Sequence, residues 1–520
     1  MARNSLFRTK ALKDLLGEMT GEHRLRRALG PVSLTALGVG AVIGAGIFVA
    51  TGEAARNTAG PALMVSYMFA GLICVFAALC YAEFASMAPV AGSAYTYAYA
   101  TLGELFAWII GWDLILEYAV GAATVAHGWS DYFQAVLRKL HIELPNTLNS
   151  AVLKFDHAKG TFETTGSYIN LPAVLIVVAI TVILVVGIRE SAKFNAAMVA
   201  IKLLTILFVI LVGVFYINWD NYTPFAPFGW AGVTFFGIPV LGEETADGKP
   251  LGMLAGAAVI FFAYIGFDAV STNAEEAKNP QRDLPIGIIF SLIVCTLLYV
   301  GVVAVLTGMV KFDQIDEHAG VSNAFEKVGL GWADFIISLA GVAGITSVLL
   351  VMMMSAPRVF LAMARDGLLP TTFFAAVHPK FQTPWKSSIL VGLFVIALAG
   401  FLPLDALLHM TNIGTLFAFA IVCTAVIVMR RTNPQAERPF RCPMVPLIPL
   451  MGIAGCLLLM FSLPVANWWR LVAWLGIGLV IYFSYSRFHS RLGKQELQEE
   501  LALQGISPAG SPADPLHPKE

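Results

Sequence analysis

The chain alternates between long apolar runs and short polar segments. The longer runs suffice to cross the roughly 30 Å hydrocarbon core of a bilayer as helices. The third and eighth runs exceed that length, so we expect tilted helices there. The pattern predicts an all-α polytopic membrane protein with twelve transmembrane helices, at 31–52, 60–87, 95–136, 171–188, 193–216, 254–276, 286–310, 332–363, 387–402, 405–430, 446–463 and 467–486.

The composition narrows the class of protein. Of 520 residues, 58% are hydrophobic and only 13% are charged, whereas soluble domains have about 25% charged residues. The formal net charge of −1 gives no reason to expect a nucleic-acid partner. The six cysteines have no metal-type spacing, so we expect buried thiols and no cofactor. No phosphate-binding loop, zinc-protease motif or nucleophile elbow is present, which argues against an enzyme or an ATP-driven pump.

The basic residues are unevenly distributed between alternate loops. The loops at 216–235 and 463–467 contain no lysine or arginine. By the positive-inside rule, we expect both termini in the cytoplasm, with the protein in the plasma membrane. The basic segments on that side are the N-terminal tail with Arg24, Arg26 and Arg27, then Arg189 and Lys193, Lys278 and Arg282, Arg358 to Lys386, Arg430 to Arg441, and Arg487 to Lys494.

Both tails lack long apolar runs. Residues 1–30 are basic and amphipathic, which favours a short interfacial helix, with a disordered tail as the alternative. They contain no cleavable signal peptide, so the first span is expected to direct insertion. At the other end, four prolines in 506–520 predict disorder.

A stretch rich in glycine interrupts the first apolar run. Gly38, Gly40, Gly44 and Gly46 fall within nine residues, and each glycine costs a helix about 1 kcal/mol relative to alanine. Unpaired backbone groups are not tolerated facing lipid, so the stretch must be buried or line a cavity. One interpretation is a broken helix whose free amides bind a carboxylate. The other is close helix packing through small residues.

In the first interpretation, the amides of four consecutive residues donate to the ligand. They belong to Ile43, Gly44, Ala45 and Gly46. The N-terminus of the second half-helix favours an anion at this point.

A second interruption lies five spans later, at Phe261–Asp268. Paired broken helices in two halves of a chain indicate an inverted-repeat transporter. Each span reverses the direction of the chain across the membrane. Because the two interruptions are an odd number of spans apart, the second copy crosses the membrane in the opposite sense. We predict a 5+5 inverted repeat of helices 1–5 (31–220) and helices 6–10 (221–431), with discontinuous helices 1 and 6. Helices 11 and 12 follow in 432–486, and tails occupy 1–30 and 487–520.

The sixth span offers the complementary polarity. Free carbonyls of Phe262, Ala263 and Ile265 would bind an ammonium group, and Asp268 adds a negative charge nearby. Asp268 also suits the start of the second half-helix as a cap. A carboxylate site facing an ammonium site is typical of an α-amino acid ligand.

Lys202 lies roughly 16 Å into the fifth span at 1.5 Å per residue. Burial disfavours the charged form of an amine, so a lysine at this depth is expected to exchange a proton or to take the place of a sodium ion. The alternative is a structural pair with a buried carboxylate. On the eighth span, Thr346 and Ser347 are expected beside Lys202, unless they hydrogen-bond their own helix.

Two carboxylates share one face of the third span. Asp113 and Glu117 are four residues apart, and lipid exposure of both would be costly. We expect Glu117 to line the substrate cavity, and Asp113 either to join it or to make an interhelical hydrogen bond. His127 is expected as a hydrogen-bonded core histidine and Glu83 as a structural residue.

Taken together, these segments resemble the amino acid–polyamine–organocation superfamily of permeases, and within it the bacterial relatives of the cationic amino acid transporters. The resemblance covers roughly residues 5–486. It rests on Leu34–Phe48, Pro89–Tyr97, Gly111–Tyr118, Phe262–Asp268 with Glu275–Pro280, Ala362–Pro370 and Asn412–Leu416.

The resemblance implies the inverted repeat, alternating access, and a substrate bound to the opened backbone of helices 1 and 6. It also implies that Lys202 stands in for sodium, as in proton-coupled members, and that Glu117 is the acid near the cavity. Members often have threonine or serine where this chain has Ala45, so a hydroxyl contact to the substrate is missing.

The leading functional hypothesis is proton-coupled uptake of an L-amino acid, with the amino acid, the proton and membrane lipid as partners. An obligate amino acid exchanger is the alternative, and a sensor that does not transport is a further one. The choice between a cationic and a neutral substrate, and the oligomeric state, stay open.

Overall fold

The computed structural model describes residues 6–10, 29–44, 46–87, 93–156, 161–187, 192–236, 238–245, 248–272, 277–317 and 319–503. Helices dominate this part of the chain, as the apolar runs predict. Each of the twelve predicted ranges contains helix. The mostly helical, polytopic class is thereby confirmed, whereas twelve membrane crossings and the inverted repeat stay predictions.

In the described part of the chain, seven helical runs are long and apolar enough to cross a membrane, at Gly46–Met87, Glu104–Lys139, Met198–Tyr216, Pro280–Met309, Gly331–Arg365, Leu404–Thr432 and Val465–His489. The main helices within them are α4 (Leu63–Met87), α6 (Glu104–Lys139), α8 (Ala192–Gly213), α11 (Pro280–Met309), α13 (Gly331–Arg365), α16 (Leu404–Thr432) and α18 (Val465–Ile481).

Five further apolar helices among the described residues are shorter. They are α2 (Pro31–Val42), α7 (Leu171–Val186), the run Met253–Tyr264 formed by α9 (Met253–Ile260) and η6 (Phe261–Tyr264), α15 (Trp385–Phe401) and α17 (Leu447–Phe461). The remaining helices are short connecting or terminal pieces: η1 (Gly46–Ala50), α3 (Thr51–Ala54), η2 (Ala55–Ala59), η3 (Gly60–Ala62), α5 (Ser93–Thr101), η4 (Val214–Tyr216), η5 (Trp219–Tyr222), α10 (Ala269–Thr272), η8 (Phe312–Gln314), α12 (Gly320–Lys327), α14 (Thr371–Phe374), η9 (Tyr482–Ser486), α19 (Arg487–His489) and α20 (Arg491–Leu503).

The strands within the described ranges form three small antiparallel hairpins between helices. They pair β1 (Leu153–Asp156) with β2 (Thr161–Thr164), β3 (Val233–Phe235) with β4 (Ile238–Leu241), and β5 (Glu243–Glu244) with β6 (Pro250–Leu251).

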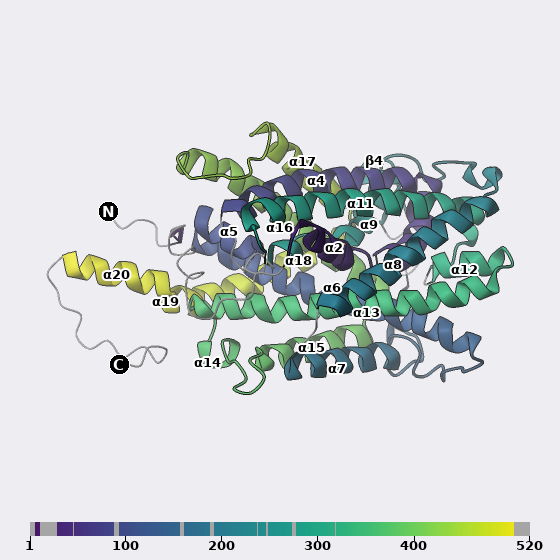
Figure 1. Cartoon of the computed structure of the whole chain (residues 1–520), viewed down its shortest axis with the longest axis horizontal. Helices are drawn as coiled ribbons and strands as arrows, with labels where there is room; N and C mark the ends of the chain where they lie inside the picture. Colours follow the sequence, from purple (N-terminus) through teal and green to yellow (C-terminus); the bar gives the residue numbers. More distant parts are fainter. Residues whose placement is uncertain are drawn as a thin grey trace.

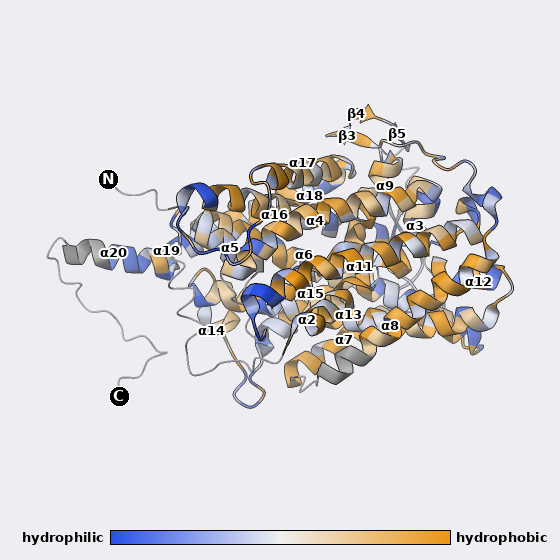
Figure 2. Ribbon diagram, turned by 45° about the horizontal axis from the view of Figure 1, so that its top comes forward, coloured by the Kyte–Doolittle hydropathy of each residue, from blue (hydrophilic) through white to orange (hydrophobic). Residues whose placement is uncertain are grey.

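Most long helices run along the long axis of the molecule (Figure 1). The third apolar run supplies the central one, because α6 packs along both α13 and α16. Helix α11 packs along α4 and α2, and α15 packs along α7. Hydrophobic residues dominate the helices along the bundle, and hydrophilic residues are more frequent toward its two ends (Figure 2), as expected for a helical protein in lipid.

Segment 6–10 and helix α20 lie at the same end of the bundle, which we call the terminal end. Arg8 there forms an ion pair with Glu496 of α20, with Nε and Oε2 2.8 Å apart. Helix α12 lies at the opposite end, the far end (Figure 1). This common location of the two terminal segments fits an even number of crossings.

The third predicted run, 95–136, is not one helix. It is divided into α5 and α6 at Gly103, whose φ of +100° is strained for any other residue. A side chain at Gly103 would also collide with the backbone of Phe7. Segment 6–10 runs alongside, where Glu104 N donates to Arg8 O at 2.9 Å and Lys10 N donates to Tyr99 O at 3.1 Å. The expectation of a single helix was wrong because this contact joins residues about a hundred positions apart.

The predicted interfacial helix in 1–30 falls mainly on residues 1–5 and 11–28, outside the described residues, and segment 6–10 is not helical. The disorder predicted for 506–520 also lies outside the described residues. Helix α20 precedes that tail and is rich in charged residues.

Candidate functional site

The helical backbone of the first run is interrupted at the glycine-rich stretch. Helix α2 ends at Val42, and Ile43 is extended, with φ −73° and ψ 108°. Gly44 lies in a bend, and helical structure resumes at Gly46 in the π-helical turn η1. Ala45, predicted to donate an amide to the substrate, lies outside the described residues. Ile43, Gly44 and Gly46 are all buried.

A matching interruption occurs in the sixth run. Helix α9 tightens into the 3₁₀ turn η6, and Ile265 is then extended, with φ −61° and ψ 133°. Gly266 follows with φ +113°. A Cβ atom at Gly266 would lie 2.9 Å from the Ala41 carbonyl oxygen. Glycine is therefore required here both by backbone conformation and by the close approach of α2.

The two interruptions contact each other. Gly46 packs against the backbone of Ala263, so closely that a Cβ atom on Gly46 would overlap it. Tyr299 of α11 connects the same region, because its hydroxyl donates toward the carbonyl oxygens of Val42 at 3.0 Å and Ala263 at 2.9 Å. The glycines thus serve close packing as well as the break, so the two interpretations of this stretch are compatible.

The three helix 6 carbonyls predicted to bind an ammonium group differ in their partners. The Ala263 oxygen is within reach of Tyr299, and the Phe262 oxygen accepts from Ile265 N at 3.2 Å. A carbonyl oxygen has two lone pairs, so both oxygens have capacity for a second donor. Phe262, Ala263 and Ile265 are all buried beside the break.

Lys202 of α8 reaches the opened end of α2. Its side chain is buried, with 1% of the residue exposed. Nζ donates to the carbonyl oxygens of Gly40 at 2.7 Å and Ile43 at 2.8 Å. Within the described ranges no carboxylate lies within ion-pair distance of this ammonium. Its partners are therefore the carbonyls released by the interruption, not a buried acid.

Thr346 and Ser347 of α13 hydrogen-bond their own helix. The Thr346 hydroxyl donates to Val342 O at 2.7 Å, and the Ser347 hydroxyl donates to Gly344 O at 3.0 Å. Gly344 of α13 packs against the Lys202 side chain, where a Cβ atom would lie 3.1 Å from Lys202 Cγ. The hydroxyl of Thr346 also accepts from Trp129 Nε1 at 2.9 Å.

Asp268 lies where η6 gives way to α10. Its Oδ2 atom accepts from the Tyr118 hydroxyl of α6 at 2.9 Å. Its carbonyl oxygen accepts from the amide of Ser271 at 2.9 Å. The residue therefore joins the second half of helix 6 to the central helix α6.

Glu117 and Asp113 are buried on α6, with 2% and 0% of each residue exposed. Among the residues that the structure describes, neither carboxyl group has a hydrogen-bond partner. Gly414 of α16 packs on Asp113, and a Cβ atom there would lie 2.8 Å from Oδ1. An ionised carboxylate without a partner is costly inside a protein, so these groups are suited to carry a proton or to meet a ligand.

Two residues of the site were missed by the sequence analysis. Tyr299 connects the interruptions, and Asn412 of α16 donates through Nδ2 to Ala258 O at 2.9 Å and Val259 O at 2.8 Å, just before η6. The available signal was a polar side chain inside an otherwise apolar run. His127 is hydrogen-bonded as expected, with Nε2 2.8 Å from Leu402 O.

Comparison with known proteins agrees with this architecture. A sequence model described as an amino acid permease matches residues 29–483. The chain is 47% identical to the branched-chain amino acid permease of Bacillus subtilis (strain 168), over 95% of this chain and 100% of that protein. It is 44% identical to the methylthioribose transporter of the same strain, over 94% and 100%. It is 38% identical to the vacuolar cationic amino acid transporter 4 of Arabidopsis thaliana, over 83% and 68%.

The family-model match, 29–483, extends through both interrupted helices and the helices that hold Lys202, Glu117 and Tyr299. The apolar helices and the transporter relatives identify a multi-pass membrane protein that is not an enzyme. The chain belongs to the amino acid permease family, within the amino acid–polyamine–organocation superfamily.

Proposed function

We propose that this protein takes up an L-amino acid together with a proton, by alternating access across the plasma membrane. The observation that carries the proposal is the position of Lys202, whose ammonium group binds the carbonyls of Gly40 and Ile43. A charged donor binds a carbonyl more strongly than a neutral one. Loss of the Lys202 proton therefore loosens the end of α2, which links protonation to the shape of the substrate site.

The substrate carboxylate binds the amides around Ile43, Gly44, Ala45 and Gly46, at the start of the second half of helix 1. This part of the proposal is supported by the helical structure that resumes at Gly46, because a helix N-terminus favours an anion. The substrate ammonium binds the carbonyls of the η6 turn and Ile265. Glu117 lies on the facing helix as a carboxyl group that accepts the proton or the ammonium.

We propose that the substrate side chain is neutral and aliphatic. Gly44 packs against Val348 of α13, and Phe262 is buried beside the break. Asp268 is engaged by Tyr118, which leaves Glu117 as the nearby acid for a cationic side chain. The relative at 47% identity is named for branched-chain amino acids, which supports the same choice.

In this mechanism the repeats 31–220 and 221–431 move relative to each other, and both termini face the cytoplasm. Gly344 holds the Lys202 side chain from the α13 side, and Ser347 is bonded to the Gly344 carbonyl. Thr346 and Ser347 thus affect proton coupling by shaping α13, not by contacting the ammonium.

The test is uptake of radiolabelled L-leucine and L-arginine into proteoliposomes, with and without an inwardly directed proton gradient. Wild-type protein is expected to accumulate leucine faster with the gradient. Lys202→Ala should abolish the gradient dependence, whereas Lys154→Ala, on the exposed strand β1, should retain it.

Three results would contradict parts of the proposal. Unchanged gradient dependence in Lys202→Ala would remove the coupling role. Uptake that occurs only with amino acid inside the vesicles would establish an obligate exchanger. Uptake of methylthioribose without competition by amino acids would place the chain with the relative that is named for that compound.

A further inference from the structure

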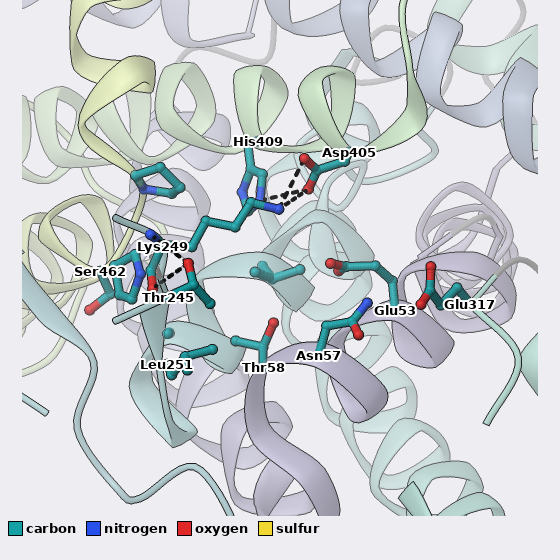
Figure 3. A pocket seen from close by; sticks show the side chains of 14 residues that line it. Glu53, Asn57, Thr58, Thr245, Lys249, Leu251, Glu317, Asp405, His409 and Ser462 are labelled. Atoms are coloured by element: carbon teal, nitrogen blue, oxygen red, sulfur yellow. Dashed lines mark hydrogen bonds and ion pairs between the residues drawn. The ribbon is translucent and has the colours of Figure 1, made fainter. Parts of the chain in front are cut away.

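A cavity of about 550 Å³ lies at the far end of the bundle, apart from the two interruptions (Figure 3). Its wall includes Val259 of α9, two residues before η6, and Glu53 of α3, in the second half of helix 1. Further walls come from η2, the loop before α9, the loop before α12, the start of α16 and the connection between α17 and α18. The cavity therefore touches both interrupted helices without including the residues of the breaks.

The charged side chains that the structure describes in this cavity are not all paired. Asp405 is neutralised, because Lys249 Nζ lies 3.0 Å from its Oδ1 atom and His409 Nε2 lies 3.2 Å from the same atom. Glu317 has a partner in Arg56, with Oε1 and Nε 3.4 Å apart. For Glu53, the described part of the chain supplies neither an ion pair nor a hydrogen bond.

Figure 3 shows the Glu53 side chain extending toward the middle of the cavity, across from Asp405 and Lys249. Among the described residues, Glu53 is thus the carboxylate of this cavity that has no ion-pair or hydrogen-bond partner. An uncompensated carboxylate in a partly enclosed, low-dielectric space attracts a small cation.

His409 supplies a second hydrogen-bond acceptor in this cavity, its ring nitrogen Nδ1. Its side chain is 8% exposed, it extends from α16 into the cavity (Figure 3), and Nδ1 has no hydrogen-bond partner among the described residues. Because the Lys249 ammonium already balances the charge of Asp405, the His409 ring can be neutral and still donate a hydrogen bond from Nε2 to Asp405. A neutral ring that donates from Nε2 leaves Nδ1 as an acceptor.

We propose that this cavity is a second ligand site, which binds a primary ammonium group between the Glu53 carboxylate and His409 Nδ1. An ammonium group has three N–H donors and no acceptor, so it satisfies both unpaired acceptors at once. The source is a free alkylamine or the amino group of an amino acid. The site is separate from the amide and carbonyl site between the two breaks.

The test uses purified protein in lipid nanodiscs and three probes that share one carbon skeleton. They are L-leucine, isopentylamine, which lacks the carboxylate, and 4-methylpentanoate, which lacks the amine. Calorimetric titration of wild-type protein is expected to show binding of isopentylamine and none of 4-methylpentanoate. Leucine that displaces the amine assigns the site to amino acids, and leucine that leaves it bound assigns the site to free amines.

Glu53→Gln is expected to weaken isopentylamine binding at least tenfold, and His409→Gln several-fold. The matched control is Glu317→Gln, the same change on a paired carboxylate of the same cavity, with less than a twofold effect expected. Thermal melting checks that each variant is folded, and the contrast between amine and acid in wild-type protein tests the site without any variant.

Equal binding of the amine to wild-type protein and folded Glu53→Gln, or equal binding of the amine and the acid, would overturn the proposal. Lys202→Ala separates this result from the transport proposal, because it alters the central site and is expected to leave amine affinity unchanged. Gradient-driven uptake without amine binding would reject only the second site.

Discussion

Gly46 packs directly against the backbone of Ala263, so the two interrupted helices meet at the points where each loses its regular hydrogen bonds. This contact joins residues more than two hundred positions apart in the sequence. It brings the amides of one break close to the carbonyls of the other. The contact between the two breaks leads to predictions for Gly46 and Tyr299, which hold the breaks together.

Replacing Gly46 by alanine should impair the protein, because the added Cβ atom would overlap Ala263. Overpacking of this kind costs about 1–3 kcal/mol. We expect the melting temperature to fall and leucine uptake to fall at least tenfold. The control is Gly476→Ala on α18, where a Cβ atom would meet nothing within 4 Å. Full uptake by Gly46→Ala would show that the breaks do not need this contact.

Tyr299→Phe removes a hydroxyl group that reaches the buried carbonyls of Val42 and Ala263. Leaving a buried acceptor unpaired costs about 1–3 kcal/mol. The variant should melt at a lower temperature and transport more slowly, although the ring still packs. Tyr168→Phe, at a position that is 76% exposed, should behave as wild type in both measurements. Equal behaviour of the two variants would argue against a bridging role.

Lys202→Arg keeps a positive charge that cannot be released at physiological pH. If proton release from Lys202 drives the cycle, the variant should lose the stimulation of uptake by lower external pH. Uptake measured over a series of external pH values, at constant internal pH, reports this directly. Wild-type uptake should rise as external pH falls. A variant with the same pH profile would exclude Lys202 as the proton carrier.

Glu83→Gln should destabilise the terminal end of the bundle. Glu83 is 1% exposed and accepts from Arg430 at 2.7 Å, from Arg438 at 3.1 Å and from Cys442 N at 2.8 Å. Removing the charge leaves two guanidinium groups partly uncompensated, at a cost of about 3 kcal/mol. The measurement is thermal or denaturant unfolding in detergent.

The matched control for Glu83 is Glu163→Gln on strand β2. Its carboxylate lies 3.6 Å from Lys154 Nζ in a pair whose lysine side chain is 58% exposed. Exposed pairs contribute less than about 1 kcal/mol. A similar loss of stability in both variants would show that burial of Glu83 adds nothing to the pair.

The sequence predicted those parts of the fold and site that depend on local pattern. Glycines inside apolar runs indicated both breaks, because each glycine weakens a helix; Gly44 and Gly46 lie at the first break and Gly266 at the second. The position of Lys202, far from either end of its span, predicted that its ammonium group is buried. Its partners, Gly40 and Ile43, could not be predicted, because they depend on how α8 packs on α2.

Other features depend on contacts between distant segments. The division at Gly103 follows from the position of Phe7, and the pairing of Asp405 with Lys249 follows from a loop about 150 residues earlier. Residues near the ends of apolar runs, such as Glu53 and His409, look like ordinary polar boundary positions. Only the packed structure shows that they share a cavity.

The hydroxyl of Tyr299 also has a consequence for how often the two breaks are in contact. Movement that separates the end of α2 from η6 must first break its contact with Val42 or Ala263. That step occurs in a buried region where water does not immediately replace the lost donor. The contact therefore stabilises the arrangement in which the two breaks touch, and without it a smaller fraction of the molecules would hold the two breaks together at any moment.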